Sequence, residues 1–168
     1  TTERLIDNSK QQKKALMQQL LTGKKRLLDD SGKPFEGEWE EVVLKDLCSK
    51  VIDNRGKTPP LSEIGLPLVE INSIVNSKYP KLSKVTKFVS PETFKTWFRN
   101  GHPERGDILV ATVGSAGISA LVNLDEGFGS IAQNLIAIRP NSKADSSFLY
   151  YLMNTPHYLS LVRAVVMG

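Results

Sequence analysis

The sequence changes its hydrophobic pattern once, at residues 29–38, and this change divides the chain in two. Residues 3–28 contain no proline and one glycine, and they consist mostly of Lys, Gln, Leu, Ala and Met, which favour a helix. After residue 38, short β-branched and aliphatic runs alternate with turn residues, a pattern typical of strands. We therefore predict an α+β chain: a long N-terminal helix over residues 1–28, a hinge over 29–38, and a mixed α/β domain over 39–168 with a twisted, largely antiparallel sheet.

Within the predicted domain, strands and helices are placed by local signals. Strands are expected at residues 42–51, 66–71, 84–89, 107–112, 119–123 and 130–138. Ser90 with Pro91 starts a helix that ends at Asn100 and Gly101, Ser146 or Ser147 caps a second helix, and Thr155 with Pro156 begins a third. This third helix is apolar and runs to the last residue, so we expect a domain truncated at its C-terminus.

The N-terminal helix is predicted to be coiled-coil-like and to carry an apolar stripe. Its apolar residues recur at spacings of three, four and seven, and lysines occupy the remaining positions. A stripe of this kind requires a partner. We predict that Leu16, Leu20 and Leu27 pack against a second helix.

Positive charge is distributed unevenly along the chain. Residues 1–33 hold eight Lys or Arg against four acids, whereas residues 34–168 hold fourteen of each. Inside the neutral domain, residues 76–100 still hold six bases and one acid. This local excess is equally consistent with a solvated surface and with a contact to a polyanion.

Several classes of protein are excluded by residue counts. One cysteine, Cys48, cannot form an internal disulfide, and with only two histidines no zinc site of Cys and His ligands can assemble. No apolar run is long enough for a membrane helix, and the first thirty residues lack the apolar stretch of a secretory signal. We expect a cytoplasmic protein without membrane contact and without a bound metal.

Catalytic motifs are incomplete throughout the chain. Gly56-Lys57-Thr58 resembles part of a phosphate-binding loop, but Val51 stands where that motif requires glycine. Ser115 lacks the Gly-x-Ser-x-Gly frame of a hydrolase, and no acid is followed two residues later by lysine, as a common nuclease motif requires. Residues 114–117 could form a nucleotide site, but a plain glycine turn is the better interpretation of them. We predict a non-catalytic binding protein.

The remaining candidates are side chains that bind nucleic acid. Arg and Asn recognise base edges, Lys, Ser and Thr hold phosphates, and loops rich in Gly and Pro present both. Three such loops lie at residues 53–60, 72–78 and 114–117. We predict DNA contacts from Arg55, Lys57, Thr58, Asn72, Ser73, Lys78, Lys81, Lys84 and Ser115.

Two further groups of side chains allow two interpretations. Gln133 and Asn134 are predicted inside an apolar strand, where a satisfied core position is at least as good an interpretation as a DNA contact. The aromatic side chains Trp39, Trp97, Tyr150 and Tyr151 are better interpreted as core residues than as stacking platforms.

Several motifs, taken in order, resemble the specificity subunit of type I restriction-modification enzymes. The segment from Gln12 to Leu27, followed by Trp39 and Leu44, is the most specific part of this likeness. Gly56-Lys57-Thr58-Pro59, Arg105-Gly106-Asp107-Ile108-Leu109 with Gly114-Ser115-x-Gly117, Gln133-Asn134-Leu135-x-x-Ile138-Arg139-Pro140 and Phe148-Leu149-Tyr150-Tyr151-Leu152 are similar to its target-recognition domain.

The resemblance implies that residues 1–28 are the end of a spacer helix and residues 39–168 one target-recognition domain. Such a module reads one half of a bipartite duplex DNA target and directs the methyltransferase and restriction endonuclease subunits to it. S-adenosylmethionine, ATP and Mg²⁺ would be held by those partner subunits, none by this chain, and a homodimer through the N-terminal helix is a further expectation. The alternative is a coiled-coil protein-docking module without direct DNA readout.

Overall fold

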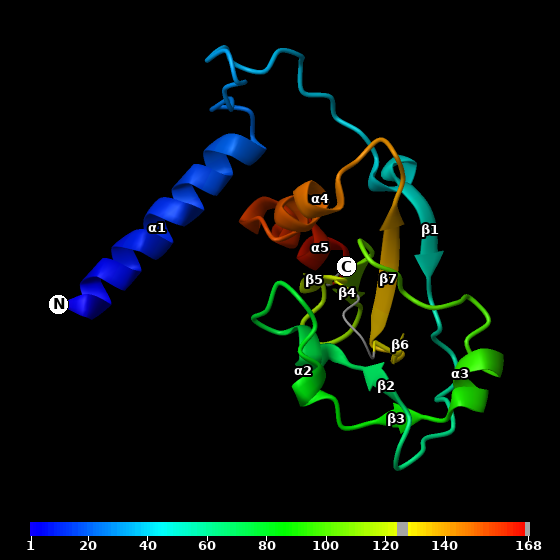
Figure 1. Ribbon diagram of the computed structural model, residues 1–168. Helices are drawn as coiled ribbons and strands as arrows, with labels where there is room; N and C mark the ends of the chain where they lie inside the picture. The colour runs from blue at the N-terminus through cyan, green and yellow to red at the C-terminus, as the bar shows by residue number, and fades with distance from the viewer. Residues whose placement is uncertain (124–127, 167–168) are drawn as a thin grey trace. The chain divides into compact units, whose positions relative to one another are not determined.

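The computed structural model describes residues 1–123 and 128–166, and the chain forms two compact units, residues 1–42 and 43–168. In the first unit, helix α1 spans Thr2–Leu21 (Figure 1). The prediction of a helix up to Leu28 is wrong. Gly23 adopts a left-handed φ of 70° and its N–H bonds the Leu20 carbonyl at 3.2 Å, which ends the helix. Leu27 therefore does not lie on α1, although Leu16 and Leu20 do.

Trp39 explains why glycine follows the helix. A Cβ atom at position 23 would lie 1.9 Å from the indole Nε1 of Trp39. The Arg26 guanidinium lies 5.6 Å from the centre of the same indole, and its Nη2 donates to the Gly37 carbonyl at 2.7 Å. The helix end and Trp39 thus form one packed corner inside the first unit.

The predicted hinge contains a tight turn. Leu28 and Pro34 form an isolated antiparallel bridge, and the Asp29 carboxylate accepts the N–H groups of Ser31 and Lys33 at 2.9 and 3.0 Å. The Ser31 hydroxyl also donates to Asp29, and these hydrogen bonds lower the pKa of Asp29.

The described part of the second unit contains two sheets as well as helices, which confirms the predicted α+β class. The four-stranded sheet has the order β1 (Cys48–Ile52), β7 (Leu135–Pro140), β4 (Ile108–Ala111), β5 (Ser119–Leu121), and all its neighbours are antiparallel. The three-stranded sheet has the order β3 (Phe88–Val89), β2 (Leu66–Val69), β6 (Ser130–Ile131), with β2 and β6 parallel.

Among the described residues of the second unit there are also six helical segments: the 3-10 turns η1 (Leu44–Leu47) and η2 (Leu82–Lys84), and the helices α2 (Ile71–Ile74), α3 (Pro91–Thr96), α4 (Ser146–Met153) and α5 (Pro156–Val166). Ser90 caps α3 as predicted, because its hydroxyl accepts the Thr93 N–H at 3.1 Å. Helix α4 is capped by Asp145, one residue earlier than expected, through the Phe148 N–H at 2.8 Å.

The core is layered on both faces of the four-stranded sheet. All four residues of β4 are buried, and they alternate between the faces. Leu109 and Ala111 belong to a cluster that also contains Val69 of the three-stranded sheet. Ile108 and Val110 belong to a cluster with residues of α4 on the other face. A third cluster, with Phe98 next to α3, covers Leu68 and Val89 of the three-stranded sheet.

The predicted strand over residues 130–138 is divided between the two sheets. The Ala132 N–H bonds the Val69 carbonyl at 2.9 Å, and the Leu135 N–H bonds the Ala132 carbonyl at 3.1 Å, so the chain turns and passes from β6 to β7. Gln133 and Asn134 therefore lie at this turn, and the prediction that placed them inside a strand is wrong.

Two motifs of the family resemblance meet in an ion pair. The register of β4 and β7 pairs Ile108 with Ile138, which places Asp107 beside Arg139. Arg139 Nε and Nη2 contact the two Asp107 carboxylate oxygens at 2.9 and 3.0 Å, and its Nη1 contacts Glu104 at 2.9 Å. Asp107 is 1% exposed, so this is a nearly buried ion pair that holds two strands together.

Candidate functional site

The loop of residues 53–60 follows the buried end of β1 and is anchored to the residues after α3. The Asn54 side-chain amide donates to the Gly101 carbonyl at 3.1 Å, and the Asn100 side-chain amide donates to the Asp53 carbonyl. Asp53 Oδ1 accepts the Arg55 N–H at 3.0 Å, which closes a small turn. Gly56 continues the loop with a φ of 121°, a left-handed value that favours glycine. The loop is thus fixed at its base, while its residues 55–58 are exposed.

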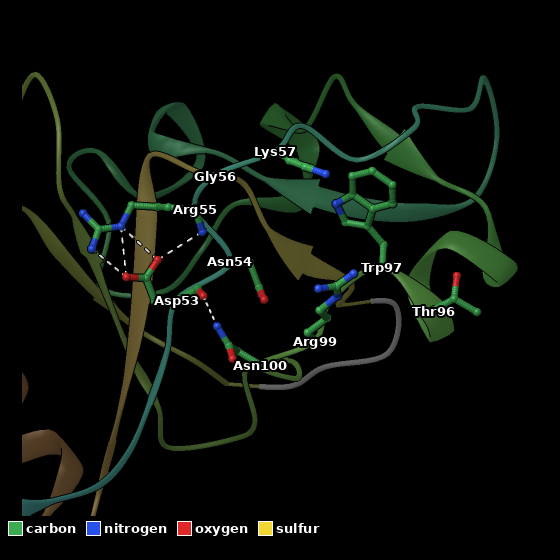
Figure 2. Close-up of a pocket in the computed structure, with 9 residues that line it drawn as sticks. All are labelled: Asp53, Asn54, Arg55, Gly56, Lys57, Thr96, Trp97, Arg99 and Asn100. Carbon is green, nitrogen blue, oxygen red and sulfur yellow. Dashed lines mark hydrogen bonds and ion pairs between the residues drawn. The ribbon is translucent and has the colours of Figure 1, made fainter.

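This loop and the end of α3 enclose a pocket of about 430 Å³ (Figure 2). Figure 2 shows Lys57 and Arg99 next to the Trp97 indole, which also packs against the third core cluster. Within residues 1–123 and 128–166, Lys57 and Arg99 take part in no ion pair. The pocket is lined by Asp53, Asn54, Arg55, Gly56, Lys57, Thr96, Trp97, Arg99 and Asn100.

Arg55 and Asp53 form an ion pair at the pocket. Arg55 Nε lies 2.9 and 3.0 Å from the two Asp53 carboxylate oxygens, and Nη2 lies 2.6 Å from Oδ2. This hydrogen-bonded pair lowers the pKa of Asp53 and raises the pKa of Arg55. Figure 2 shows the Arg55 side chain folded back over Asp53, directed away from Trp97.

A second hollow of about 220 Å³ lies on the continuation of the same loop, at Thr58 and Pro59. The Gln133 side-chain amide donates to the Thr58 hydroxyl, and Lys87 forms an ion pair with Glu70 at 2.8 Å. Asn134 Oδ1 is buried there without a hydrogen-bond partner among the described residues. The turn between β6 and β7 therefore lines this hollow with Gln133 and Asn134, next to the loop.

Two of the predicted contact residues are engaged inside the domain. Ser73 is fully buried in α2, so its hydroxyl cannot reach a ligand at the surface, and the prediction of a contact there is wrong. Lys78 is partly buried, and its Nζ donates to the Tyr151 hydroxyl at 3.1 Å. This hydrogen bond raises the pKa of Lys78. The Lys78 ammonium also lies 4.9 to 6.0 Å from the ring centroids of Tyr79, Tyr150 and Tyr151. The charge of Lys78 is therefore used in contacts inside the domain.

The other predicted residues are exposed but do not all lie together. Asn72 is exposed and its amide donates to the Lys84 carbonyl at 3.0 Å. Lys81, Lys84 and Ser115 are exposed, and none of them lines either pocket. Of the nine predicted DNA contacts, the two pockets bring together Arg55, Lys57 and Thr58.

Sequence reasoning missed Trp97, Arg99 and Asn100 as parts of the site. Arg99 was visible as a member of the basic run, and Asn100 as a helix stop signal. Nothing in the local sequence indicates that residues 47 positions apart, such as Asp53 and Asn100, are hydrogen-bonded.

Within the described residues, no group of three or more His, Cys, Asp and Glu side chains is placed to hold a metal ion. The same part of the chain holds no helix long and apolar enough to cross a lipid bilayer.

The fold is that of a specificity subunit of type I restriction-modification systems. The chain is similar to the HsdS subunit from Thermoanaerobacter tengcongensis, with a TM-score of 0.60 and 22% identity over 97% of this chain and 38% of that chain. It is also similar to a chain in a structure of complex assembly and conformational transition in the type I R-M system, with a TM-score of 0.52 and 19% identity over 96% of this chain and 39% of that one.

The predicted likeness to specificity subunits is thereby confirmed for the fold. The chain spans about two fifths of the length of each of these solved chains. None of the protein-family models and none of the curated proteins with which the sequence was compared matches it.

Proposed function

We propose that this chain is a DNA-recognition module of a type I restriction-modification system. Residues 43–168 read one half of a bipartite duplex target, and the chain directs methyltransferase and restriction endonuclease subunits to it without catalysing a reaction. S-adenosylmethionine, ATP and Mg²⁺ belong to those partner subunits in this proposal. The likeness to HsdS over nearly the whole chain supports this role.

The observation that carries the proposal is the anchored loop at residues 53–60. It presents two exposed cations: Lys57 lies beside Arg99 and the Trp97 indole, and Arg55 is folded back over Asp53. The base of the loop is fixed by hydrogen bonds from Asn54 to Gly101 and from Asn100 to Asp53. Cations held on a rigid support are suited to phosphates and base edges, because little conformational freedom is lost when they bind.

Helix α1 supplies the assembly element of this proposal. None of its residues is buried, and Leu16 on the apolar stripe is 43% exposed. We assign Leu16 and Leu20 to packing against a second helix, either on a partner subunit or on a second copy of the chain. The alternative, a docking module that makes no DNA contact, rests on this same stripe.

Salt-dependent binding to duplex DNA tests the proposal. Affinity should fall steeply as salt rises, because each phosphate contact releases condensed counterions. Lys57→Ala should weaken binding to all sequences and reduce the slope of log affinity against log salt by about one. The measurement is fluorescence anisotropy of a labelled duplex titrated with the 168-residue chain at several salt concentrations.

Lys143→Ala provides the matched control, because Lys143 is an exposed lysine outside both pockets. It should leave affinity and slope unchanged. Equal effects of the two substitutions, or binding that does not respond to salt, contradict the assignment of the loop. Complex formation through Leu16 and Leu20 without any DNA binding would favour the docking alternative.

A further inference from the structure

Arg55 keeps one edge of its guanidinium unoccupied. A guanidinium carries five N–H donors in a planar fork. Asp53 takes the edge formed by Nε and Nη2, with contacts at 2.6 to 3.0 Å. Among the described residues, no hydrogen bond involves Nη1. The outer edge, formed by Nη1 and the second hydrogen of Nη2, is therefore available for a bidentate contact.

The ion pair orients Arg55 more than it stabilises the fold. The two side chains are 53% and 33% exposed, and surface ion pairs at such exposure contribute little to stability. Asp53 is itself held in place by two hydrogen bonds. Its carbonyl oxygen accepts one from the Asn100 side-chain amide, and its Oδ1 accepts one from the Arg55 N–H. The direction of the guanidinium is thus set by a chain of contacts that begins at the buried end of β1.

The neighbouring carboxylate selects the kind of acceptor that Arg55 can bind. A phosphate placed on the outer edge would lie close to the Asp53 charge and be repelled by it, whereas a neutral base edge, which carries only partial charges, would be repelled far less. In the major groove, guanine presents two neighbouring acceptors, O6 and N7, which match two parallel N–H donors. Adenine presents one acceptor beside a donor, so it matches only half of the free edge.

We propose that Arg55 reads a guanine in the major groove and that Asp53 is its positioning residue. This inference rests on the proposed function, because it assigns a base to one residue of that same DNA interface. Lys57, two residues further along the loop and without an ion-pair partner among the described residues, contacts phosphate instead.

Selection from a randomised duplex library tests this assignment with the 168-residue chain. The wild-type chain should select a motif with an invariant guanine. Arg55→Ala should lose the preference at that one position, with discrimination against the other bases falling roughly tenfold or more. Lys57→Ala should weaken binding to every sequence and leave the motif intact.

Asp53→Asn separates orientation from folding. The asparagine Oδ1 can still accept the Arg55 N–H, so the turn persists, whereas the charge that holds the guanidinium is gone. In this variant, discrimination in favour of guanine should fall in part. A separate variant, Arg55→Lys, should not retain the discrimination, because an ammonium lacks the planar fork of a guanidinium. Equal thermal unfolding midpoints for wild type, Asp53→Asn and Arg55→Ala should accompany these results.

The outcomes separate the inference from the proposed function. If the Arg55→Ala variant selects the same motif as the wild-type chain, the inference is wrong, but the proposed DNA recognition still holds. Uniform weakening by Arg55→Ala with a smaller salt slope makes Arg55 a phosphate contact and also overturns it. If the wild-type chain selects no motif, the proposed function fails and the inference fails with it.

Discussion

His102 is packed between aromatic rings next to the candidate site. Its imidazole stacks on Phe94 with ring centroids 3.6 Å apart and 9° between the planes, and Phe98 lies 5.2 Å away. Burial lowers the pKa of His102 below its ordinary value of 6.5, and the charge of Lys50 acts in the same direction. The fold therefore favours the neutral form of this histidine.

Stability should consequently fall on acidification. The unfolded chain protonates His102 as the pH drops through about 6.5, whereas the folded chain resists until a lower pH, so unfolding is favoured in that window. We expect the urea midpoint to fall between about pH 7.5 and about pH 5.5, and His102→Phe to reduce this fall. The same loss in the variant would show that other groups, such as carboxylates, cause it.

Two residues show the limit of sequence reasoning at this scale. In the sequence, Lys78 resembles Lys57, because both are lysines in turn-rich loops. In the structure, however, Lys78 donates a hydrogen bond to Tyr151, 73 positions further along the chain. Ser73 looks like a loop hydroxyl and is buried. Local composition predicts charge and polarity, but it does not show which side chains point inward. The exposure of Arg55 and Lys57 could be predicted, because a Gly- and Pro-rich loop keeps them at the surface.

At the scale of elements, the register of β4 and β7 converts two short motifs into one structural unit. The residue before β4, Asp107, and a residue within β7, Arg139, come from segments 32 positions apart and share a bidentate ion pair. Asp107 also accepts the Glu104 N–H at 2.8 Å, which fixes the turn that leads into β4. The motifs of the family resemblance at these positions therefore hold the two strands of the sheet together.

Substitutions of the two acidic partners of Arg139 should change the free energy of unfolding by different amounts, because one partner is buried and the other is exposed. Asp107→Asn should lower the free energy of unfolding by about 3 kcal/mol, because it leaves Arg139 without its buried counter-charge. Glu104→Gln, which removes an exposed partner of the same arginine, should lower it by less than about 1 kcal/mol. Urea denaturation measures both. A small effect of Asp107→Asn would mean that Glu104 carries the pairing.

Element boundaries were predicted well where caps are local and poorly where tertiary contacts decide them. The start of α3 follows from Ser90 and Pro91 alone. Helix α1 ends seven residues before the predicted end at Leu28, at a glycine whose space Trp39 needs. The strand predicted over residues 130–138 divides because the Ala132 N–H bonds the other sheet. Neither of these two contacts leaves a signal within a short window of sequence.

At the scale of the whole molecule, the buried core belongs to one of the two units. Every buried hydrophobic residue lies at position 52 or later, and none lies in α1. The second unit thus holds its own core between two sheets and their covering helices. The first unit holds a helix that presents an apolar stripe and a corner closed by Trp39.

Residues 43–168 should therefore fold without residues 1–42. We expect cooperative thermal unfolding of this fragment, followed by circular dichroism, at a midpoint close to that of the whole chain. Residues 1–42 alone should be weakly helical, because an isolated helix of this length is marginal in water. A fragment 43–168 that unfolds without cooperativity would show that the first unit contributes to the core.

The anchors of loop 53–60 have a consequence for how such a protein can change over generations. The loop is held through the carbonyl oxygens of Asp53 and Gly101 and the amides of Asn54 and Asn100. Positions 55 and 57 take no part in these anchors, so single substitutions there alter the exposed chemistry and leave the support intact. In a module that recognises DNA, this separation of support from contact makes specificity evolvable one residue at a time, on a scaffold that does not have to be rebuilt.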